Sequence, residues 1–293
     1  MKKTAKPTAR VAVIGGSGLY HMPGLEAPRE LRVQTPFGPP SGPIMAGTLA
    51  GVPCAFLARH GAGHVLLPSE VNARANIWAL KSLGVDRIIA VSAVGSLKEE
   101  LAPRDFVFPD QLVDETKQRV STFFGAGVVG HVAFDQPFCR AQSEALFRHA
   151  RGLSLRCHQG GTLVCMEGPA FSTRAESDYH RRMGYSIIGM TAVPEARLAR
   201  EAELCYSPIS LVTDYDCWKE GEEVSSEKVL ENLSVNVANA QRLIAAAVAD
   251  VAGRPRTCRC ATALTGAIFT APGAMARGTA RKLDIIAGRH LKG

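Results

Sequence analysis

The hydrophobic positions of the chain follow two patterns. Short apolar runs that end in Gly or in a polar residue predict buried strands. Longer segments with an apolar residue every three or four positions predict amphipathic helices. The predicted strands cover residues 10–14, 54–58, 87–91, 106–113, 161–166, 186–190 and 207–213, and the predicted helices cover 70–83, 140–152, 173–183, 194–203 and 227–251.

The order of these elements indicates an α/β fold. Strands alternate with helices, which is typical of a sandwich in which helices pack on a parallel or mixed sheet. Neither an internal repeat nor a linker interrupts the alternation. We therefore predict a basic N-terminal tail over residues 1–10, one domain over 11–252, and a C-terminal helix with a basic tail over 253–293.

The net charge of +7 is concentrated at the ends of the chain. Residues 1–10 hold four basic groups and no acid, and residues 251–293 hold eight basic groups and one acid. Residues 11–250 therefore carry 22 basic and 26 acidic groups. A nucleic-acid surface would place its positive charge on the folded domain, so we expect no nucleic-acid partner. No apolar run approaches the roughly 20 residues of a membrane helix, and we expect a cytoplasmic protein.

The chain has eight cysteines, and none of them is part of a CxxC pair. This spacing argues against a zinc site. In a cytoplasmic protein we expect unpaired thiols. The alternative is an intracellular protein with disulfides, as thermophiles contain. The cysteines are Cys54, Cys139, Cys157, Cys165, Cys205, Cys217, Cys258 and Cys260, and the last two form a CxC pair.

Polar residues gather where the predicted strands end. In α/β sheets, ligands bind at the carboxyl ends of strands, so these residues are candidates for one site. Five of them can donate hydrogen bonds without contributing a carboxylate, which suits a phosphate ligand. The five donors are Ser17, Arg59, His60, Ser92 and Thr191, and the other strand-end residues are Met190, Asp214 and Asp216.

Two of these motifs have alternative interpretations. The segment Ile14–Tyr20, IGGSGLY, lacks the GxGxxG spacing of a dinucleotide site. It suits a nest of backbone N–H groups around an anion, with the Ser17 hydroxyl as a further donor, or else a tight turn. Arg59 and His60 together offer a bidentate fork and a donor for phosphate. Their alternative is a surface salt bridge beside a hydrogen-bonded histidine.

Asp214 and Asp216 are two residues apart, so their carboxylates lie on the same side of an extended chain. Two close acids push their pKa values apart, and one of them can stay protonated at neutral pH. A protonated carboxyl can donate to a ring nitrogen while an ionised one accepts from an amino group. The alternatives are an exposed turn or a metal site, although no third ligand lies nearby in the sequence.

The segment 167–177, EGPAFSTRAES, predicts a loop that enters a helix. Phe171 can stack on a planar ring. Ser172 either contacts a ligand or caps the helix.

The ordered motifs of the chain resemble one enzyme family, the S-methyl-5'-thioadenosine phosphorylases among the trimeric purine nucleoside phosphorylases. The resemblance covers roughly residues 10–250. It implies a single-domain, three-layer sandwich around a mixed, partly barrel-like sheet. The motifs are IGGSGLY, TPFGPPS, LARHG, NARANIWALKSLGV, VSAVGSL, PDQLVDET, MEGPAFSTRAES, GMTAVPEARLAREAELCY and VTDYDCWKE.

The resemblance also implies a reaction and a site. Phosphate attacks C1' of the nucleoside and releases adenine, with no metal or organic cofactor. The phosphate would contact Ser17, Arg59, His60, Ser92 and Thr191, of which Ser17 and Ser92 stand where the family commonly has Thr. The ribose would contact Met190, and the purine would contact Ala93, Phe171, Ser172, Asp214 and Asp216, with Asp214 as the catalytic acid.

The resemblance further implies an apolar hole for the 5' methylthio group. Val229 and Leu230 would line it, although periodicity alone assigns them to an ordinary helix core. His131 would reach in from a neighbouring subunit of a homotrimer, and a dimer of trimers is the alternative assembly. Cys139 and Cys205, like the CxC pair, stand where some archaeal relatives form disulfides.

Other functions remain open at this level. Within the family they are phosphorolysis of methylthioinosine and a broad purine nucleoside phosphorylase activity. In a different class, the chain would be a non-catalytic nucleotide- or RNA-binding protein that uses its basic tails.

Overall fold

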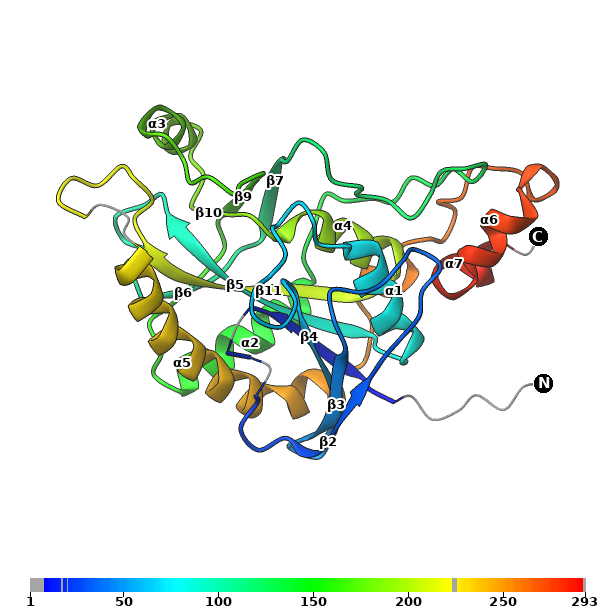
Figure 1. The fold of residues 1–293 in the computed structure, drawn as a ribbon, viewed down its shortest axis with the longest axis horizontal. Coiled ribbons are helices and arrows are strands. Elements are labelled where there is room, and N and C mark those ends of the chain that lie inside the picture. Colours follow the sequence, from blue (N-terminus) through cyan, green and yellow to red (C-terminus); the bar gives the residue numbers. More distant parts are fainter. Residues whose placement is uncertain (1–7, 17, 20, 223–225, 292–293) are drawn as a thin grey trace.

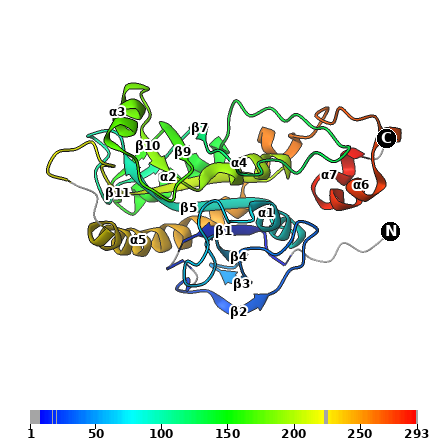
Figure 2. The ribbon, with the colours of Figure 1, turned by 45° about the horizontal axis from the view of Figure 1, so that its top comes forward.

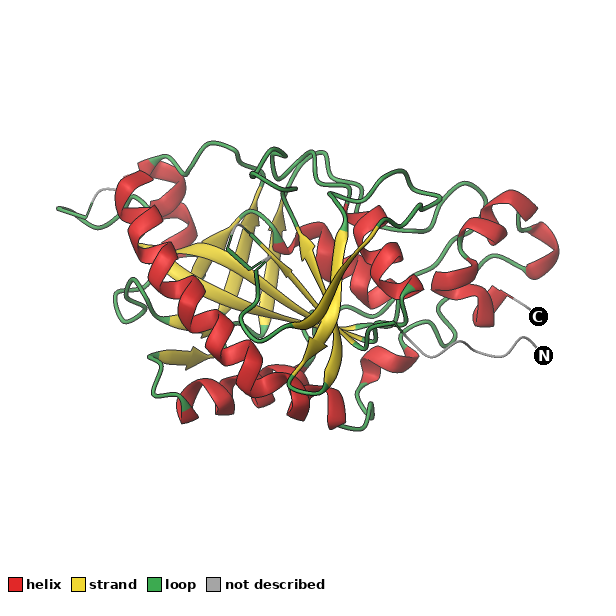
Figure 3. Cartoon of the chain, turned by 60° about the horizontal axis from the view of Figure 1, so that its bottom comes forward, coloured by secondary structure: helices red, strands yellow, loops and turns green. Residues whose placement is uncertain are grey.

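The computed structural model describes residues 8–16, 18–19, 21–222 and 226–291. In this part of the chain, eleven strands form one sheet with helices on both faces (Figures 1 and 3). The predicted α/β sandwich with a mixed sheet is confirmed. The strands are β1 (Val11–Gly15), β2 (Glu26–Leu31), β3 (Ile44–Leu49), β4 (Val52–Ala58), β5 (Arg87–Ser96), β6 (Phe106–Phe108), β7 (Gln111–Glu115), β8 (Cys157–Gln159), β9 (Thr162–Met166), β10 (Ile187–Gly189) and β11 (Cys205–Asp214).

The sheet runs in the order β2-β3-β4-β1-β5-β10-β9-β7, and it branches at β5. The first half of β5 pairs in parallel with β1, and its last two residues pair in antiparallel fashion with β10. On its other side β5 pairs in parallel with β11, which in turn pairs with β6. The branch leaves the sheet incompletely closed, which agrees with the partly barrel-like sheet that the resemblance implies.

Alternation along the central strands divides the core between the two faces of the sheet. In β1, Ala12 and Ile14 pack into one cluster while Val11 and Val13 pack into the other. The first cluster contains residues of α1, α4 and α7, and the second contains residues of α2 and α5. Because successive strand side chains point to opposite faces, one apolar run fills both cores.

The helices lie in the same order as the helical patterns of the sequence. Helix α5 runs along one face of the sheet beside α2 (Figure 1). At one end of the molecule α7 packs against α1 (Figure 2). The α-helices are α1 (Ala73–Ser82), α2 (Arg140–Gly152), α3 (Arg174–Arg182), α4 (Ala192–Glu201), α5 (Ser226–Gly253), α6 (Arg277–Lys282) and α7 (Asp284–Leu291), and the 3-10 turns are η1 (Arg259–Thr262) and η2 (Pro272–Ala274).

Three differences from the sequence-based elements have physical reasons. The predicted strand 106–113 is two strands, β6 and β7, because Pro109 follows β6 and has no N–H to continue a ladder. The edge strand β2 is exposed and charged, so it carries no apolar alternation. The hairpin between β3 and β4 turns at Ala50 and Gly51, both at positive φ. Such a turn is easily recognised only when Asn or Gly occupies its first position.

The C-terminal residues after α5 fold back onto the domain. Ile268 forms a bridge with Gly130, and the Leu264 N–H donates to Glu203 Oε1 at 3.2 Å. Leu264, Leu283 and Ile286 are buried in the core cluster of α1 and α4. In the described part of the chain, no helix combines the length and the apolar character that crossing a bilayer requires.

Candidate active site

Strand β5 lies at the centre of the candidate site. The strands β1, β4 and β11 run parallel to it, so their carboxyl ends lie at the same edge of the sheet. Ser92 of β5 pairs with Ser210 of β11, and Gly95 pairs with Asp214. The last residues of β5 therefore connect the segment after β4 with the segment after β11, as expected for a ligand site in an α/β sheet.

Arg59 follows β4 and is buried, with 2% of its surface exposed. Its Nε and Nη2 atoms donate to the two carboxylate oxygens of Glu195 at 2.6 and 3.0 Å. Its Nη1 donates to the Val91 carbonyl at 2.9 Å, next to Ser92. The Arg59 ion pair is thus buried and bidentate, and the alternative of a surface salt bridge is wrong.

His60 is buried beside Arg59, and its ring stacks on His64 with 4.3 Å between centroids. Nδ1 lies 2.9 Å from the Leu66 carbonyl. Because a carbonyl only accepts, Nδ1 carries a proton, and Nε2 of the neutral ring is then an acceptor. Burial, together with the Arg59 charge, lowers the pKa of His60 to about 4. His60 is therefore neutral at pH 7.

Met190 and Thr191 follow β10, which pairs with the end of β5. Ile188 lies opposite Gly95 in antiparallel register, so the chain after β10 leads back toward Ala93 and Ser92. Thr191 is the N-cap residue of α4, but its hydroxyl makes no capping hydrogen bond. Val193 has non-helical backbone angles and Pro194 has no N–H, so the regular part of α4 begins only after this kink, with the Glu195 carboxylate in its first turn.

Asp214 and Asp216 lie at the end of β11, against the close-packed strand β5. A Cβ atom on Gly95 would lie 2.9 Å from Asp214 Oδ1 and 3.4 Å from Asp216 Cβ, so only glycine leaves room there. Asp214 Oδ2 accepts from the Thr213 hydroxyl at 2.7 Å, and Oδ1 accepts from the Asp216 N–H at 2.8 Å. The main chain at Asp216 has a positive φ, and the Asp216 side chain is buried.

The two carboxyl groups have different surroundings. Burial, and to a smaller degree the neighbouring Asp216, raises the pKa of Asp214. Asp216 Oδ2 is buried and has no hydrogen-bond partner. Among the residues that the structure describes, no third carboxylate, histidine or cysteine joins the pair to form a metal-ligand set. The arrangement can hold one proton and leaves one carboxylate oxygen ready for a ligand donor.

Phe171 and Ser172 lie between β9 and α3. Phe171 is 60% exposed, and the Ser172 carbonyl accepts from the Cys217 thiol at 3.3 Å, next to Asp216. The N-cap residue of α3 is Thr173, which forms a capping box with Glu176. The alternative in which Ser172 caps the helix is therefore wrong.

Val229 and Leu230 lie in the first turns of α5. Val229 is half-buried and Leu230 is 64% exposed, so they do not form the ordinary helix core that periodicity alone indicates. The Asn232 side chain donates to the Thr213 carbonyl at 2.8 Å, which fixes this end of α5 beside the end of β11. Two apolar side chains that are not fully buried therefore lie on the turn of α5 that is held beside this strand end.

Two predicted residues do not join this group. Ser17 lies outside the described residues. His131 is exposed, its N–H donates to the Ala267 carbonyl at 2.9 Å, and its ring packs on Phe269 with 5.1 Å between centroids. The segment that carries it runs from β7 toward α6 and α7 (Figure 1). Within one chain, His131 therefore belongs to the C-terminal region.

Sequence reasoning missed three residues that support the site. Glu195 accepts from Arg59 and, at 2.9 Å, from the Tyr206 hydroxyl. The Arg119 guanidinium donates to the carbonyls of Glu167 at 2.6 Å and Val193 at 2.7 Å and to that of Met190. Arg119 thereby ties the ends of β9 and β10 to the start of α4. These partners lie between 11 and 136 positions apart and on different elements, so no fixed spacing marks them in a sequence.

Comparison with known proteins agrees with this geometry. Residues 10–249 match the profile of the Phosphorylase superfamily. The S-methyl-5'-thioadenosine phosphorylase of Koribacter versatilis (strain Ellin345) is 52% identical over 283 residues, which are 96% of this chain and 97% of the relative. The chain belongs to the S-methyl-5'-thioadenosine phosphorylases of the phosphorylase superfamily.

Solved structures show the same likeness in three dimensions. A methylthioadenosine phosphorylase sourced from an antarctic soil metagenomic library is 50% identical and superimposes with a TM-score of 0.92, over 96% of this chain and 99% of that one. A methylthioadenosine phosphorylase from Schistosoma mansoni in complex with adenine is 39% identical, with a TM-score of 0.83 over 88% of this chain and 98% of that one. Both confirm the nucleoside phosphorylase fold implied by the resemblance.

Proposed function

We propose that the protein catalyses the phosphorolysis of S-methyl-5'-thioadenosine. Phosphate attacks C1' of the sugar, the glycosidic bond to N9 breaks, and adenine and 5-methylthioribose 1-phosphate are released. The observation that carries this proposal is the half-buried Asp214, whose pKa is raised, beside a group of candidate phosphate-binding residues at the same sheet edge. The products are those of purine and methionine salvage, which we place in the cytoplasm.

The phosphate site consists of Ser17, Arg59, His60, Ser92 and Thr191. Arg59 lies at this point in its buried ion pair with Glu195, and the Thr191 hydroxyl makes no capping hydrogen bond, which leaves it able to contact a phosphate oxygen. Neutral His60 presents Nε2 as an acceptor, so it binds a protonated phosphate oxygen rather than donating to an ionised one. The bound phosphate then acts as nucleophile and stabilises the positive charge that develops on the sugar. Phosphate is a co-substrate, and no cofactor takes part.

The purine site uses the two carboxyl groups differently. When the glycosidic bond breaks, negative charge develops on the base, and the proton on Asp214 stabilises it at N7. Asp216 accepts from the 6-amino group through its unpartnered oxygen. Phe171 and Ala93 face the ring, Ser172 adds a polar contact, and Met190 contacts the ribose. An acid at position 214 thereby favours a 6-aminopurine over a 6-oxopurine.

The 5' group of the nucleoside meets the apolar side chains of α5. Val229 and Leu230 provide a surface without hydrogen-bonding groups, which suits a methylthio group better than a hydroxyl. The exposure of Leu230 supports this assignment because a core residue of α5 would be covered.

The substitution Asp214→Asn tests the assignment of the acid. An amide cannot release a proton to N7 of adenine, so we expect kcat/KM for methylthioadenosine and adenosine to fall by about 100-fold or more. Activity on inosine should fall much less, because an amide N–H can donate to the O6 atom of a 6-oxopurine, whereas adenine has an amino group there that only donates. Initial rates on the three nucleosides, with and without phosphate, provide the measurement.

Asp178→Asn serves as the control, because Asp178 is a half-exposed carboxylate on α3 outside the proposed site. Equal losses on adenosine and inosine would remove Asp214 from its role. Base release that does not depend on phosphate would remove the proposed reaction itself.

A further inference from the structure

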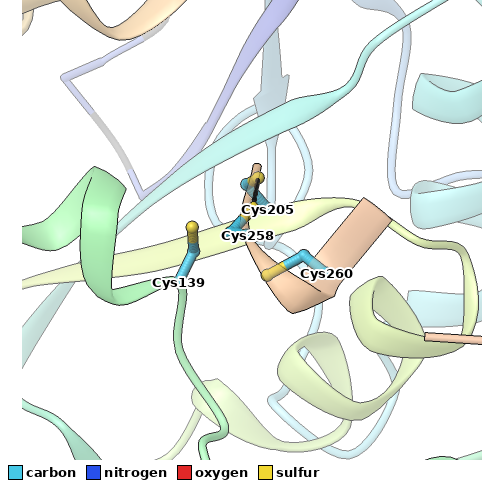
Figure 4. Close-up of side chains that lie close together, drawn as sticks. All are labelled: Cys139, Cys205, Cys258 and Cys260. Atoms are coloured by element: carbon cyan, nitrogen blue, oxygen red, sulfur yellow. Dashed lines mark hydrogen bonds between the residues drawn. The ribbon is translucent and has the colours of Figure 1, made fainter. Parts of the chain in front are cut away.

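Four cysteines that are far apart in the sequence meet at one point of the fold. The Sγ atoms of Cys139, Cys205, Cys258 and Cys260 all lie within 4.8 Å of one another. Figure 4 shows the four side chains coming together from α2, β11 and η1. Elsewhere in the described part of the chain, no comparable set of three or more histidine, cysteine or carboxylate groups occurs. We call these four residues the thiol cluster.

The distances within the thiol cluster suit a metal ion better than disulfide bonds. A tetrahedral zinc ion with Zn–S bonds of about 2.3 Å holds its four sulfurs about 3.8 Å apart. The sulfurs of Cys205 and Cys258 are 3.4 Å apart. A disulfide requires about 2.05 Å, and all eight cysteines of the chain are unbonded in this structure. The cluster thus has the size of a tetrathiolate site.

The scaffold holds the four sulfurs in place through backbone contacts. The Cys139 N–H donates to the Tyr206 carbonyl at 2.8 Å, which joins the start of α2 to the start of β11. The Ser207 hydroxyl donates to the Cys139 carbonyl at 3.1 Å. Cys258 and Cys260 lie at the start of η1, with a hydrogen bond of 3.2 Å from the Ala261 N–H to the Cys258 carbonyl. Ligands on rigid elements bind a metal with little loss of conformational entropy.

Positively charged side chains near the thiol cluster suit the negative charge of a metal ion bound by four thiolates. Four thiolates around a divalent ion leave a net charge of −2. Arg87 and Arg254 line the same small cavity as Cys139, Cys205 and Cys258. Arg87 is almost fully buried and Arg254 is half-buried, so two positively charged side chains stand beside the cluster and offset part of this charge. Cys258 is half-buried while the other three cysteines are buried, so the cluster keeps one side near solvent, where an ion can arrive.

We propose that the thiol cluster binds one zinc ion as a structural site. Four protein ligands leave no open position for a substrate, so the ion serves folding rather than chemistry. Binding would tie the segment after α5 to α2 and β11. That segment continues into the residues that pair with Gly130 and into α7. The ligands of this site come from three separate parts of the chain. A search for CxxC spacing in the sequence therefore could not detect it.

Metal analysis of the full-length protein tests the proposal. Protein from cells grown with added zinc should contain about one zinc per chain after gel filtration. The double variant Cys258→Ser, Cys260→Ser should lose at least 80% of that zinc. Cys157→Ser is the matched control, because Cys157 is half-buried on β8 outside the cluster and its loss should leave the zinc content unchanged.

A second measurement uses only the wild-type protein, so it does not depend on whether a cysteine variant folds. Reduced, metal-free wild-type protein should bind Co²⁺ with the absorption bands of a tetrahedral thiolate site, and Zn²⁺ should abolish them. Limited proteolysis should then cut the segment 254–276 at least fivefold faster without zinc than with it. Fewer than eight thiols in the denatured, unreduced protein, iron in place of zinc, or the absence of cobalt–thiolate bands would overturn the proposal.

Discussion

At the residue scale, the candidate site depends on a few buried polar contacts. Arg59 has its carboxylate partner, Glu195, 136 positions away in the sequence, and Tyr206 completes the arrangement. The sequence correctly placed Arg59 and Asp214 at strand ends, but the predicted strand 87–91 continues to Ser96 as β5, so Ser92 lies within a strand and not after one. It did not indicate their partners, because contacts between side chains on different elements have no fixed spacing.

The substitution Glu195→Gln should lower the free energy of unfolding by about 3–5 kcal/mol, because it leaves the Arg59 guanidinium buried without a counter-charge. Tyr206→Phe removes one hydrogen bond to the same carboxylate and should cost only about 1 kcal/mol. Urea denaturation followed by circular dichroism at fixed protein concentration measures both. Similar losses for the two variants would contradict the buried ion pair.

At the element scale, the periodic segments were predictable and the irregular ones were not. The strands β1, β4, β5 and β11 are apolar runs that end in Gly or polar residues, so their existence and their order followed from the pattern. The edge strand β2 lacks that pattern, and β6 and β7 are divided by one proline. The segment between β7 and α2 has no regular structure for most of its length, and only its contacts define its course.

One of those contacts makes the stability of the protein depend on pH. Glu201 of α4 accepts from the Thr122 hydroxyl at 2.7 Å and from the Phe123 N–H at 2.6 Å. Burial raises the pKa of Glu201 from 4.5 to about 7. The folded protein therefore keeps a proton that the unfolded chain releases near pH 4.5. The stability contributed by this proton is complete below that pH and is lost as the pH rises to about 7.

The substitution Glu201→Gln should flatten this part of the stability profile. We expect the wild-type free energy of unfolding to fall by about 2 kcal/mol more than that of the variant between pH 4.5 and 7. Denaturation curves at several pH values measure the difference. Glu144→Gln, at a half-exposed position of α2, is the control. A profile of Glu201→Gln that parallels the wild type would show that the carboxyl does not titrate in this range.

At the scale of the whole molecule, His131 is the residue that one chain does not bring to the site. It lies with Ala267 and Phe269 in the C-terminal region, while the proposed substrate site surrounds the end of β5. We propose that the protein forms a homotrimer in which His131 of one subunit completes the site of the next. The alternative assembly, a dimer of trimers, preserves this arrangement.

Mixed oligomers test the shared site. The variants His131→Ala and Asp214→Asn should each have low activity when expressed alone. When the two chains are co-expressed, some sites should combine the native His131 of one chain with the native Asp214 of the other. Random assembly predicts about a quarter of the wild-type methylthioadenosine activity. Two separately purified variants, mixed only in the assay, provide the control. If the co-expressed protein has just the mean activity of the two variants, each chain has a self-contained site.

The sequence by itself determined the fold class, the order of the main elements and the strand ends that carry the proposed chemistry. These features follow from local periodicity and from the rule that strand carboxyl ends hold ligands, and both can be read along a single chain. Only the tertiary structure decided the tautomer of His60, the raised pKa of Asp214 and the meeting of four cysteines. Each of these depends on burial or on distances between residues far apart in the sequence, which exist only once the chain has folded.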